Sequence, residues 1–487
     1  MTATPELTTE LTTDLFLGGS FVPGRAGTFT SLNPSTGAPL AEVSAASPED
    51  VDAAVAAATA ALHGDWAAVP PSGKGALIHR LADLVERDAT VLANLDSLDM
   101  GVPNGLAQML FVPNLVATLR YYAGWADKIN GEQISNDGYF GRPTHAYTLR
   151  QPVGVIAAIV PWNAPLMILG WKLAPALACG NTVIVKPAED ASLSILHLAR
   201  LAEEVGFPAG VVQVLPGEGT VTGAALVRHP GVHKVSFTGS TQVGREIQKV
   251  TADTFKRTTL ELGGKSAQIV CADANLDAVF PSIGMGVFAN SGQTCAAGSR
   301  VFVHRSLYDA VLDGLGGAAG AQVLGDPFDP TTTLGPLVNA AQRDRVLGYV
   351  AAGSAEGARL VAGGRAVGEA GFFVEPTVFA GTNEMTIARE EIFGPVATVI
   401  PFDSDEEALR LANDTAYGLA GTIYTNDLAR AHALSAGLQA GAIGVNGWSP
   451  LMPQLPWGGL KASGVGRECG YDGILANTES KTVTVVL

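Results

Sequence analysis

The chain has few cysteines, few basic residues and little charge of either sign. Its four cysteines, Cys179, Cys271, Cys295 and Cys469, are scattered through 487 residues without a CxxC pair or a metal-ligand spacing. This scatter argues against a disulfide framework or a cysteine-based metal site, and it is typical of a reducing compartment. We therefore expect a cytoplasmic protein with no bound metal.

Basic residues are also outnumbered. Lysine and arginine total 30 against 46 acidic residues, which gives a net charge of −16. A chain with this balance is a poor match for nucleic acid or for an anionic membrane. The first fifteen residues, MTATPELTTELTTDL, are acidic and polar, so they lack the basic and apolar segments of a secretory signal.

One uncharged run, residues 151–171, has the length of a membrane span. However, Pro152, Pro161 and Pro165 would break a helix there, and Asn163 would place an amide near its centre. We interpret the run as a buried strand, a tight loop and the start of a helix in a soluble protein.

Apolar residues, by contrast, are plentiful. They make up 47% of the chain, which is typical of a well-buried globular protein. A chain of 487 residues is too long for one ordinary core, so we expect two or three domains. Apolar strands expected at 153–160, 182–186, 211–215 and 234–237 alternate with helices, and this alternation predicts a parallel sheet covered on both faces. Ligands of such sheets bind beyond the carboxyl ends of the strands. A second α/β region is expected from about residue 260 to 461.

Two outlying segments have strand-like patterns. Residues 139–150 are polar and aromatic, and we expect them to form a small protruding hairpin. The tail 481–487 (KTVTVVL) alternates in the manner of a strand added to a sheet edge, in this chain or in a partner.

Cys295 lies in FANSGQTCAAGSR (288–300), among small and polar residues that would let a substrate approach. A reactive cysteine needs access and a means of becoming thiolate, whereas a structural one lies inert in an apolar core. The segment alone leaves both readings open.

Two other positions have a catalytic and an ordinary interpretation. In Pro161-Trp162-Asn163 the Asn163 amide could donate to an oxyanion, or could bond its own backbone in a turn. Glu261 stands two residues before the Gly263-Gly264 pair, where it could serve as a general base or be a plain loop glutamate.

Three segments could hold a nucleotide. Lys186 and Glu189 follow a strand, where they could bind ribose hydroxyls and disfavour a 2′-phosphate, or form a solvated loop. Residues 237–240 (FTGS) lead into a helix whose N-terminus could receive a pyrophosphate, although the spacing is not GxGxxG. Glu391 and Phe393 could contact a second ribose and a nicotinamide ring, or belong to a loop with a buried phenylalanine.

Together and in this order, these segments resemble the NAD(P)-dependent aldehyde dehydrogenase superfamily, of the hydrolytic type that does not acylate CoA. The resemblance extends from about residue 15 to the final strand. It rests on PWN (161–163), KPAE (186–189), FTGS (237–240), ELGGK (261–265), GQTC (292–295), EEIFGP (390–395) and PWGGLKASGVGRE (456–468).

The resemblance implies an α/β, aldehyde dehydrogenase-like fold in three parts. These are a Rossmann-type NAD-binding domain (1–132 and 153–260), an α/β catalytic domain (261–462) and a small β oligomerisation element (133–152 and 463–487). A homodimer or homotetramer follows from the same resemblance.

The resemblance also implies residue roles. The Cys295 thiolate attacks the aldehyde carbon, Asn163 and the Cys295 N–H hold the oxyanion, and hydride passes to NAD to leave a thioester. Glu261 activates the water that hydrolyses it, with Lys172 and Glu468 nearby. NAD is favoured over NADP because Glu189 is present, and the implied cofactor contacts are Pro161, Trp162, Lys186, Glu189, Gly217, Phe237, Gly239, Ser240, Gly263, Glu391 and Phe393.

By position, a substrate tunnel is expected from Ala164, Ile168, Trp171, Phe288 and Thr294, and from residues 447–457, which include Trp448, Leu451 and Trp457. That loop has no lysine or arginine, and burying an unpaired carboxylate is costly. We therefore expect an uncharged aromatic or medium-chain aliphatic aldehyde.

The chain departs from the family pattern at two positions. Trp457 stands where phenylalanine is common, and Cys469 stands where leucine is common. Two rival functions remain: a CoA-acylating relative, which typically lacks the glutamate found here at Glu261, and a catalytically silent binding protein on the same fold.

Overall fold

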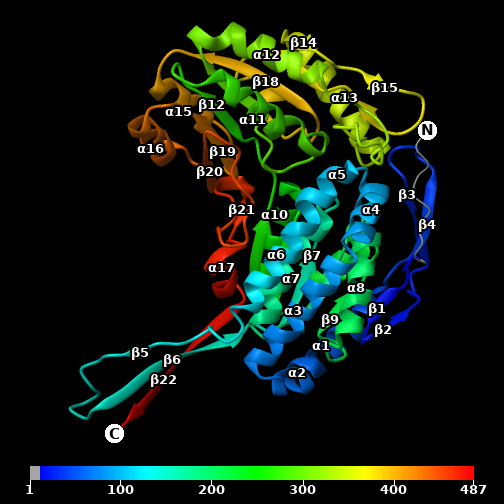
Figure 1. The fold of residues 1–487 in the computed structure, drawn as a ribbon. Helices are drawn as coiled ribbons and strands as arrows, with labels where there is room; N and C mark the ends of the chain where they lie inside the picture. Colours follow the sequence, from blue (N-terminus) through cyan, green and yellow to red (C-terminus); the bar gives the residue numbers. More distant parts are fainter. Residues whose placement is uncertain (1–10) are drawn as a thin grey trace.

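The computed structural model describes residues 11–487. It has two large β-sheets in two bodies, one above the other in Figure 1, and a narrow three-stranded sheet that extends from the lower body. The expectation that the chain lacks a secretory signal rests mostly on residues 1–10 (MTATPELTTE), which lie outside the described residues.

The first sheet has eight strands, and its central strands β9, β8, β7, β10 and β11 run parallel. In spatial order the strands are β2 (Ser20–Val22), β1 (Leu15–Leu17), β9 (Val212–Val214), β8 (Thr182–Lys186), β7 (Val155–Ile159), β10 (Lys234–Thr238), β11 (Arg257–Glu261) and β21 (Gly464–Val465). Each apolar strand expected from the sequence is present, and the uncharged run 151–171 is indeed a strand, a loop and a helix.

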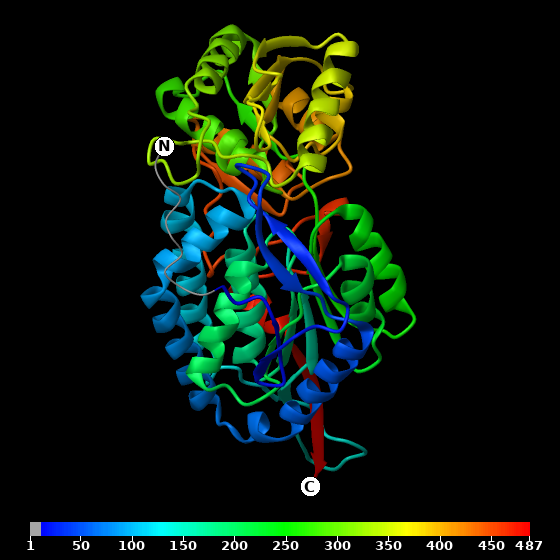
Figure 2. The same cartoon turned by 90° about the vertical axis from the view of Figure 1, so that its right-hand side faces the viewer.

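Helices cover both faces of this sheet (Figures 1 and 2). On one face lie α2 (Asp65–Ala68), α3 (Pro71–Arg87), α4 (Ala89–Met100), α6 (Val112–Ala123), α7 (Pro165–Ala178), α8 (Leu193–Val205) and α17 (Gly470–Leu475). On the other lie α1 (Pro48–His63), α9 (Ala224–Arg228) and α10 (Thr241–Ala252). The short α5 (Asn104–Leu106) precedes a π-helical turn at Ala107–Phe111, and a second such turn is at Gly219–Gly223.

Strands β10 and β11 differ from ordinary buried parallel strands, which are apolar on both faces. Val235, Phe237 and Leu260 join the apolar core on the side of α1 and α10. The opposite side of the same two strands presents five buried polar residues, which we call the polar face: Lys234, Ser236, Thr238, Thr259 and Glu261. The parallel register places Ser236 beside Thr259 and Thr238 beside Glu261.

Helix α7 packs on that side of the sheet. It begins at Pro165, a residue suited to the first turn of a helix, and all fourteen of its residues are buried. Lys172 is its single charged residue, so the helix brings one cation to the buried interior. In residues 11–487 no helix combines the length and the apolar character needed to cross a membrane.

The second sheet has seven strands, and it forms the upper body in Figure 1. In order they are β14 (Arg359–Ala362), β17 (Thr377–Ala380), β18 (Val396–Phe402), β13 (Arg300–His304), β12 (Ala267–Val270), β19 (Ala420–Tyr424) and β20 (Ala442–Val445). Its helices are α11 (Leu276–Phe288), α12 (Tyr308–Gly320), α13 (Ala340–Ala355), α14 (Thr386–Arg389), α15 (Asp405–Asn413) and α16 (Leu428–Gly437). Two small hairpins are β3 (Thr28–Leu32) with β4 (Pro39–Ser44), and β15 (Ala366–Val367) with β16 (Phe373–Val374).

The projecting sheet consists of β5 (Gln133–Ile134), β6 (Thr144–Pro152) and β22 (Thr478–Val486). The tail strand expected from the sequence is present, and it pairs antiparallel with β6 of its own chain along nine residues. Residues 463–477, which precede β22, were expected to belong to the projecting element with it. They remain in the lower body, because β21 pairs with β11 and α17 packs on α7.

Candidate active site

Three cavities lie around the carboxyl ends of β7, β10 and β11. We call them the outer cleft, of about 440 Å³, the inner cleft, of about 230 Å³, and the tunnel, of about 60 Å³. Cys295 and Asn163 line both the inner cleft and the tunnel, and Glu261 lines the inner cleft. Two of the three residues expected to act on the substrate therefore border both cavities, and the third borders the inner cleft.

Cys295 follows a tight turn rather than a regular element. Asn290 and Ser291 have left-handed backbone angles, and a Cβ at Gly292 would stand 2.1 Å from the Gly394 oxygen. The thiol is partly exposed to the cavities. Burial, followed by the nearby Glu391 and Glu261 carboxylates, raises the pKa of the Cys295 thiol to about 12. The cysteine therefore rests as the neutral thiol.

Asn163 is fixed to the same turn. Its Nδ2 donates to the Gln293 carbonyl at 2.8 Å, and Asn290 Nδ2 donates to the Asn163 carbonyl at 2.7 Å. An amide nitrogen has two hydrogens, so one remains for a ligand in the cavity. Sequence reasoning missed Asn290, whose signal was an asparagine suited to a left-handed turn just before the cysteine.

Glu261 ends β11 on the polar face. It is buried, and neither carboxylate oxygen has a hydrogen-bond partner among residues 11–487. Burial, and then the charge of Glu468, raises the pKa of Glu261 well above its ordinary value, against the smaller lowering effect of Lys172. A carboxylate with raised proton affinity and two free oxygens is suited to take a proton from water.

Lys172 and Glu468 form a buried ion pair beside Glu261, with 2.6 Å between Nζ and Oε1. Glu468 is held because its backbone and that of Trp457 exchange two hydrogen bonds of 2.7 Å. The Trp457 ring lies 5.9 Å from that of Trp171, the residue before Lys172. The ion pair and an aromatic wall of the tunnel therefore stand on the same two backbone segments.

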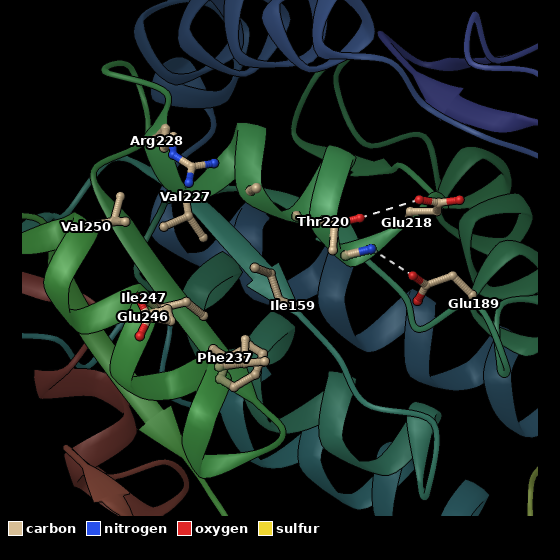
Figure 3. Close-up of a pocket in the computed structure, with 14 residues that line it drawn as sticks. Ile159, Glu189, Glu218, Thr220, Val227, Arg228, Phe237, Glu246, Ile247 and Val250 are labelled. Carbon is tan, nitrogen blue, oxygen red and sulfur yellow. Dashed lines mark hydrogen bonds between the residues drawn. The ribbon is translucent and has the colours of Figure 1, made fainter. Parts of the chain in front are cut away.

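The outer cleft lies between β7, β10 and the helices α9 and α10 (Figure 3). Ile159, Phe237 and Ile247 give it apolar walls suited to a flat ring. At one end Glu189 accepts from the Gly219 N–H at 2.7 Å and pairs with Lys186 Nζ at 2.9 Å. The Glu189 carboxylate is placed to accept hydrogen bonds from ribose hydroxyls.

The inner cleft continues past the end of β10. Ser240 caps α10 by accepting from the Val243 N–H, and Thr238 Oγ1 is buried with no partner in the described part of the chain. Glu391 accepts from the Gly264 N–H at 2.9 Å, and the Phe393 ring stands edge-on to Trp162.

These two clefts fit a dinucleotide such as NAD. One offers apolar walls with a ribose-binding carboxylate, and the other offers a capped helix N-terminus, an orphaned hydroxyl and a second carboxylate. The expected cofactor residues that line the inner cleft are Pro161, Trp162, Gly239, Ser240, Gly263, Glu391 and Phe393, and those that line the outer cleft are Glu189 and Phe237.

Two expected cofactor residues line neither cleft. Lys186 reaches the outer cleft through its pair with Glu189. Gly217 belongs to the turn after β9, where its φ of +148° and a Cβ position 2.2 Å from Thr222 Oγ1 require glycine.

Helix α13 supplies two cleft residues that sequence reasoning missed. Arg345 donates to the Glu391 carbonyl at 2.7 Å, and Gln342 donates to the Phe393 carbonyl at 2.7 Å. Both line the inner cleft and hold the loop that presents Glu391 and Phe393. Polar residues on a polar helix gave no local signal of this role.

Seven of the eight expected substrate residues line the tunnel: Ala164, Ile168, Trp171, Thr294, Trp448, Leu451 and Trp457. Phe288 does not, because it packs into the core of the upper body, while Met285 and Ala289 line the tunnel instead. Other lining residues that the sequence did not indicate are Leu106, Leu110, Phe111, Met167 and Asn290. No aspartate, glutamate, lysine or arginine is among the described residues that line this cavity.

A family model described as the aldehyde dehydrogenase family matches residues 21–483. The chain belongs to the aldehyde dehydrogenase family. It is 45% identical to human retinal dehydrogenase 2 over 479 residues, which cover 97% of this chain and 92% of that protein. It is 46% identical to human mitochondrial aldehyde dehydrogenase over 462 residues, 94% of this chain and 89% of that one.

Solved structures of aldehyde dehydrogenases also match this chain. An NAD+ complex of a Bacillus cereus aldehyde dehydrogenase matches with a TM-score of 0.96 and 44% identity, over 99% of this chain and 97% of that one. A Pseudomonas syringae indole-3-acetaldehyde dehydrogenase in complex with NAD+ matches with a TM-score of 0.96 and 40% identity, over 99% and 98%. The chain is thus an aldehyde dehydrogenase that uses NAD, as the sequence predicted.

Proposed function

We propose that this aldehyde dehydrogenase works by the cysteine route and releases a free carboxylic acid. The observation that supports this most is the position of Cys295 at the junction of the tunnel and the inner cleft, with Asn163 and Glu261 beside it. The resting thiol of Cys295 gives its proton to solvent water, the thiolate sulfur forms a bond to the aldehyde carbon, and the carbonyl π electrons move to oxygen. The second Asn163 amide hydrogen and the Cys295 N–H stabilise that oxyanion.

NAD, when bound across the two clefts, supplies the hydride acceptor. Cys295 then holds the acyl group as a thioester. Glu261 takes a proton from a water molecule, the resulting hydroxide attacks the thioester carbon, and the sulfur leaves as thiolate. The raised pKa of Glu261 gives the carboxylate enough proton affinity for that step.

We propose that the substrate is an uncharged aromatic or medium-chain aliphatic aldehyde. The tunnel walls are apolar, and a buried carboxylate on the substrate would find no cation among the described lining residues. Two relatives are named for retinal and for indole-3-acetaldehyde, which are uncharged aldehydes.

A panel of aldehydes with NAD, followed by NADH absorbance with and without CoA, tests the proposed reaction. We expect turnover without CoA, and a kcat/KM for aromatic and medium-chain aldehydes above that for carboxylated semialdehydes by on the order of 100-fold. The substrate proposal is wrong if a carboxylated semialdehyde has the highest kcat/KM. A strict requirement for CoA would instead favour the acylating alternative.

We propose that Glu189 sets the preference for NAD over NADP. Its carboxylate lies at the end of the outer cleft where we place the adenosine ribose, and it would repel the negative charge of a 2′-phosphate on that ribose. We expect Glu189→Gln, which keeps an oxygen for the Gly219 N–H, to raise the NADP-to-NAD ratio of kcat/KM by about tenfold. Glu246→Gln is the control, because Glu246 lies at another wall of the outer cleft (Figure 3). An equal change in both variants would mean that overall charge, not Glu189, sets the preference.

We propose that the projecting sheet joins copies of the chain into a homodimer or homotetramer. Exposed apolar side chains gather on it, including Ile134, Tyr139, Phe140, Leu149 and Val485, and such patches mark interaction surfaces. We also propose that residues 133–152 and the strand β22 serve oligomerisation, that residues 1–132 and 153–260 bind the cofactor, and that residues 261–462 carry out catalysis.

We propose a cytoplasmic location for the protein. Its four cysteines are free and separate from one another, which is typical of a reducing compartment.

A further inference from the structure

The polar face contains more polar residues than the proposed reaction uses. Glu261 and Thr238 line the inner cleft, but Lys234, Ser236 and Thr259 do not. Burying hydroxyl and amine groups in the middle of a parallel sheet has a cost unless each finds a partner. Ser236 is the member with two partners in the site.

Ser236 makes a closed triangle with Lys172 and Glu468. Its hydroxyl donates to Glu468 Oε1 at 2.9 Å, and its oxygen accepts from Lys172 Nζ at 3.3 Å, while Lys172 also donates to the same Oε1. All three side chains are at most 4% exposed. The three groups come from β10, α7 and the segment after β21, so the triangle fixes three separate elements relative to one another.

The two oxygens of the Glu468 carboxylate differ in their hydrogen bonds. Oε1 of Glu468 accepts from two donors, whereas Oε2 has no partner among the described residues, and the same holds for both oxygens of Glu261. The negative charge on Glu468 raises the proton affinity of Glu261. Whatever fixes the position of the Glu468 carboxylate therefore also sets the strength of Glu261 as a base.

We propose that Ser236 is a positioning residue for thioester hydrolysis, and that its hydroxyl holds the Glu468 carboxylate in place beside the general base Glu261. The proposal rests on the hydrolytic role proposed above for Glu261. Without the hydroxyl, the Glu468 carboxylate loses one of the two donors that hold Oε1, its negative charge is no longer fixed beside Glu261, and Glu261 becomes a weaker base.

Other titratable groups face Glu468 and limit the pH range of a test. Cys469 is adjacent in sequence and Tyr122 is on α6; burial and the charge of Glu468 raise the pKa of both groups, so both stay neutral below pH 8. Lys234 on β10 donates to the Ala476 carbonyl and to Asn477 Oδ1, and burial lowers its pKa to about 8. Measurements below about pH 7 keep the Lys234 amine charged.

The test is the decay of the Cys295 thioester, measured by quenched flow and mass spectrometry after mixing enzyme, NAD and one equivalent of aldehyde. In Ser236→Ala we expect the plateau rate of hydrolysis to fall about fivefold to tenfold. We also expect its acid limb to move to lower pH by roughly half a unit to one unit, because Glu261 stays ionised longer. Ser236→Thr retains the hydroxyl and should restore both values.

The matched control is Thr259→Val, next to Ser236 in register on the same face. We expect it to leave the acid limb in place. A lower plateau with an unmoved limb in Ser236→Ala, or an equal shift in Thr259→Val, would overturn the proposal, since packing alone explains those results. If Ser236→Ala does not fold, Ser236→Cys, with a weaker donor, should show an intermediate shift, and an unshifted limb in it counts against the proposal. A wild-type enzyme that forms no thioester would instead refute the proposed function itself.

Discussion

Glu261→Gln should produce one equivalent of NADH per active site and then almost stop. Formation of the thioester does not need the carboxylate, so the first turnover remains, whereas hydrolysis loses its base. Loss of a general base typically costs 10²- to 10⁴-fold, and we expect a fall in steady-state kcat in about that range. Stopped-flow absorbance separates the burst from the steady state, and the acyl group should be found on Cys295 by mass spectrometry.

The pH dependence follows from the same carboxylate. Only ionised Glu261 can accept a proton, so hydrolysis in the wild type should fall as the pH falls through its raised pKa. A folded-state pKa above the unfolded value means that this group contributes stability at low pH, which is lost as the pH rises through the folded pKa. Glutamine carries no charge, so Glu261→Gln should unfold at a higher temperature than the wild type at neutral pH.

Glu203→Gln, at an exposed carboxylate on α8, serves as the control for both measurements. It should keep wild-type turnover and the wild-type melting temperature. A Glu261→Gln enzyme that sustains turnover at the wild-type rate would show that another group activates the water.

Cys295→Ala should abolish NADH formation, including the burst, while NAD binding persists. The nucleophile forms the bond on which every later step depends, and we expect a loss on the order of 10⁴-fold or more. Because alanine removes only the sulfur of Cys295, which is one of fourteen residues that line the inner cleft, the affinity for NAD measured by calorimetry should change little.

Cys271→Ala, in the core of the upper body, provides the comparison and should retain activity. A thiol reagent should label Cys295 in preference to the three buried cysteines, and faster as the pH rises, because the resting thiol is neutral. A chain that neither reduces NAD nor binds it would support the catalytically silent alternative.

The parts of the site that could be predicted from sequence are those fixed by short segments. Asn163, Ser240 and Cys295 lie in turns that directly follow or precede one element, so their local residues indicated both the turn and the chemistry. The parallel sheet was predictable for the same reason, because its strands are continuous apolar runs.

Residues that reach the site from distant elements could not be predicted in this way. Gln342 and Arg345 act by holding the carbonyls of another loop, and nothing in their own helix shows it. The packing of Phe288 could not be predicted, because a position near the cysteine does not fix which side of α11 faces the tunnel. Met285 faces the tunnel, and Phe288 packs into the core of the upper body. The pairing of β21 with β11 could not be predicted either, because a two-residue strand has no recognisable sequence pattern.

The shared backbone of the tunnel and the ion pair has a consequence for how such an enzyme can diversify. Trp171 precedes Lys172, and Trp457 is hydrogen-bonded through its backbone to Glu468. A substitution that reshapes the tunnel at either tryptophan therefore shifts the segments that hold the charges beside Glu261. New substrate ranges and new pH optima should then arise together in evolved variants, and a library screened at a single pH would discard active members whose optimum had moved.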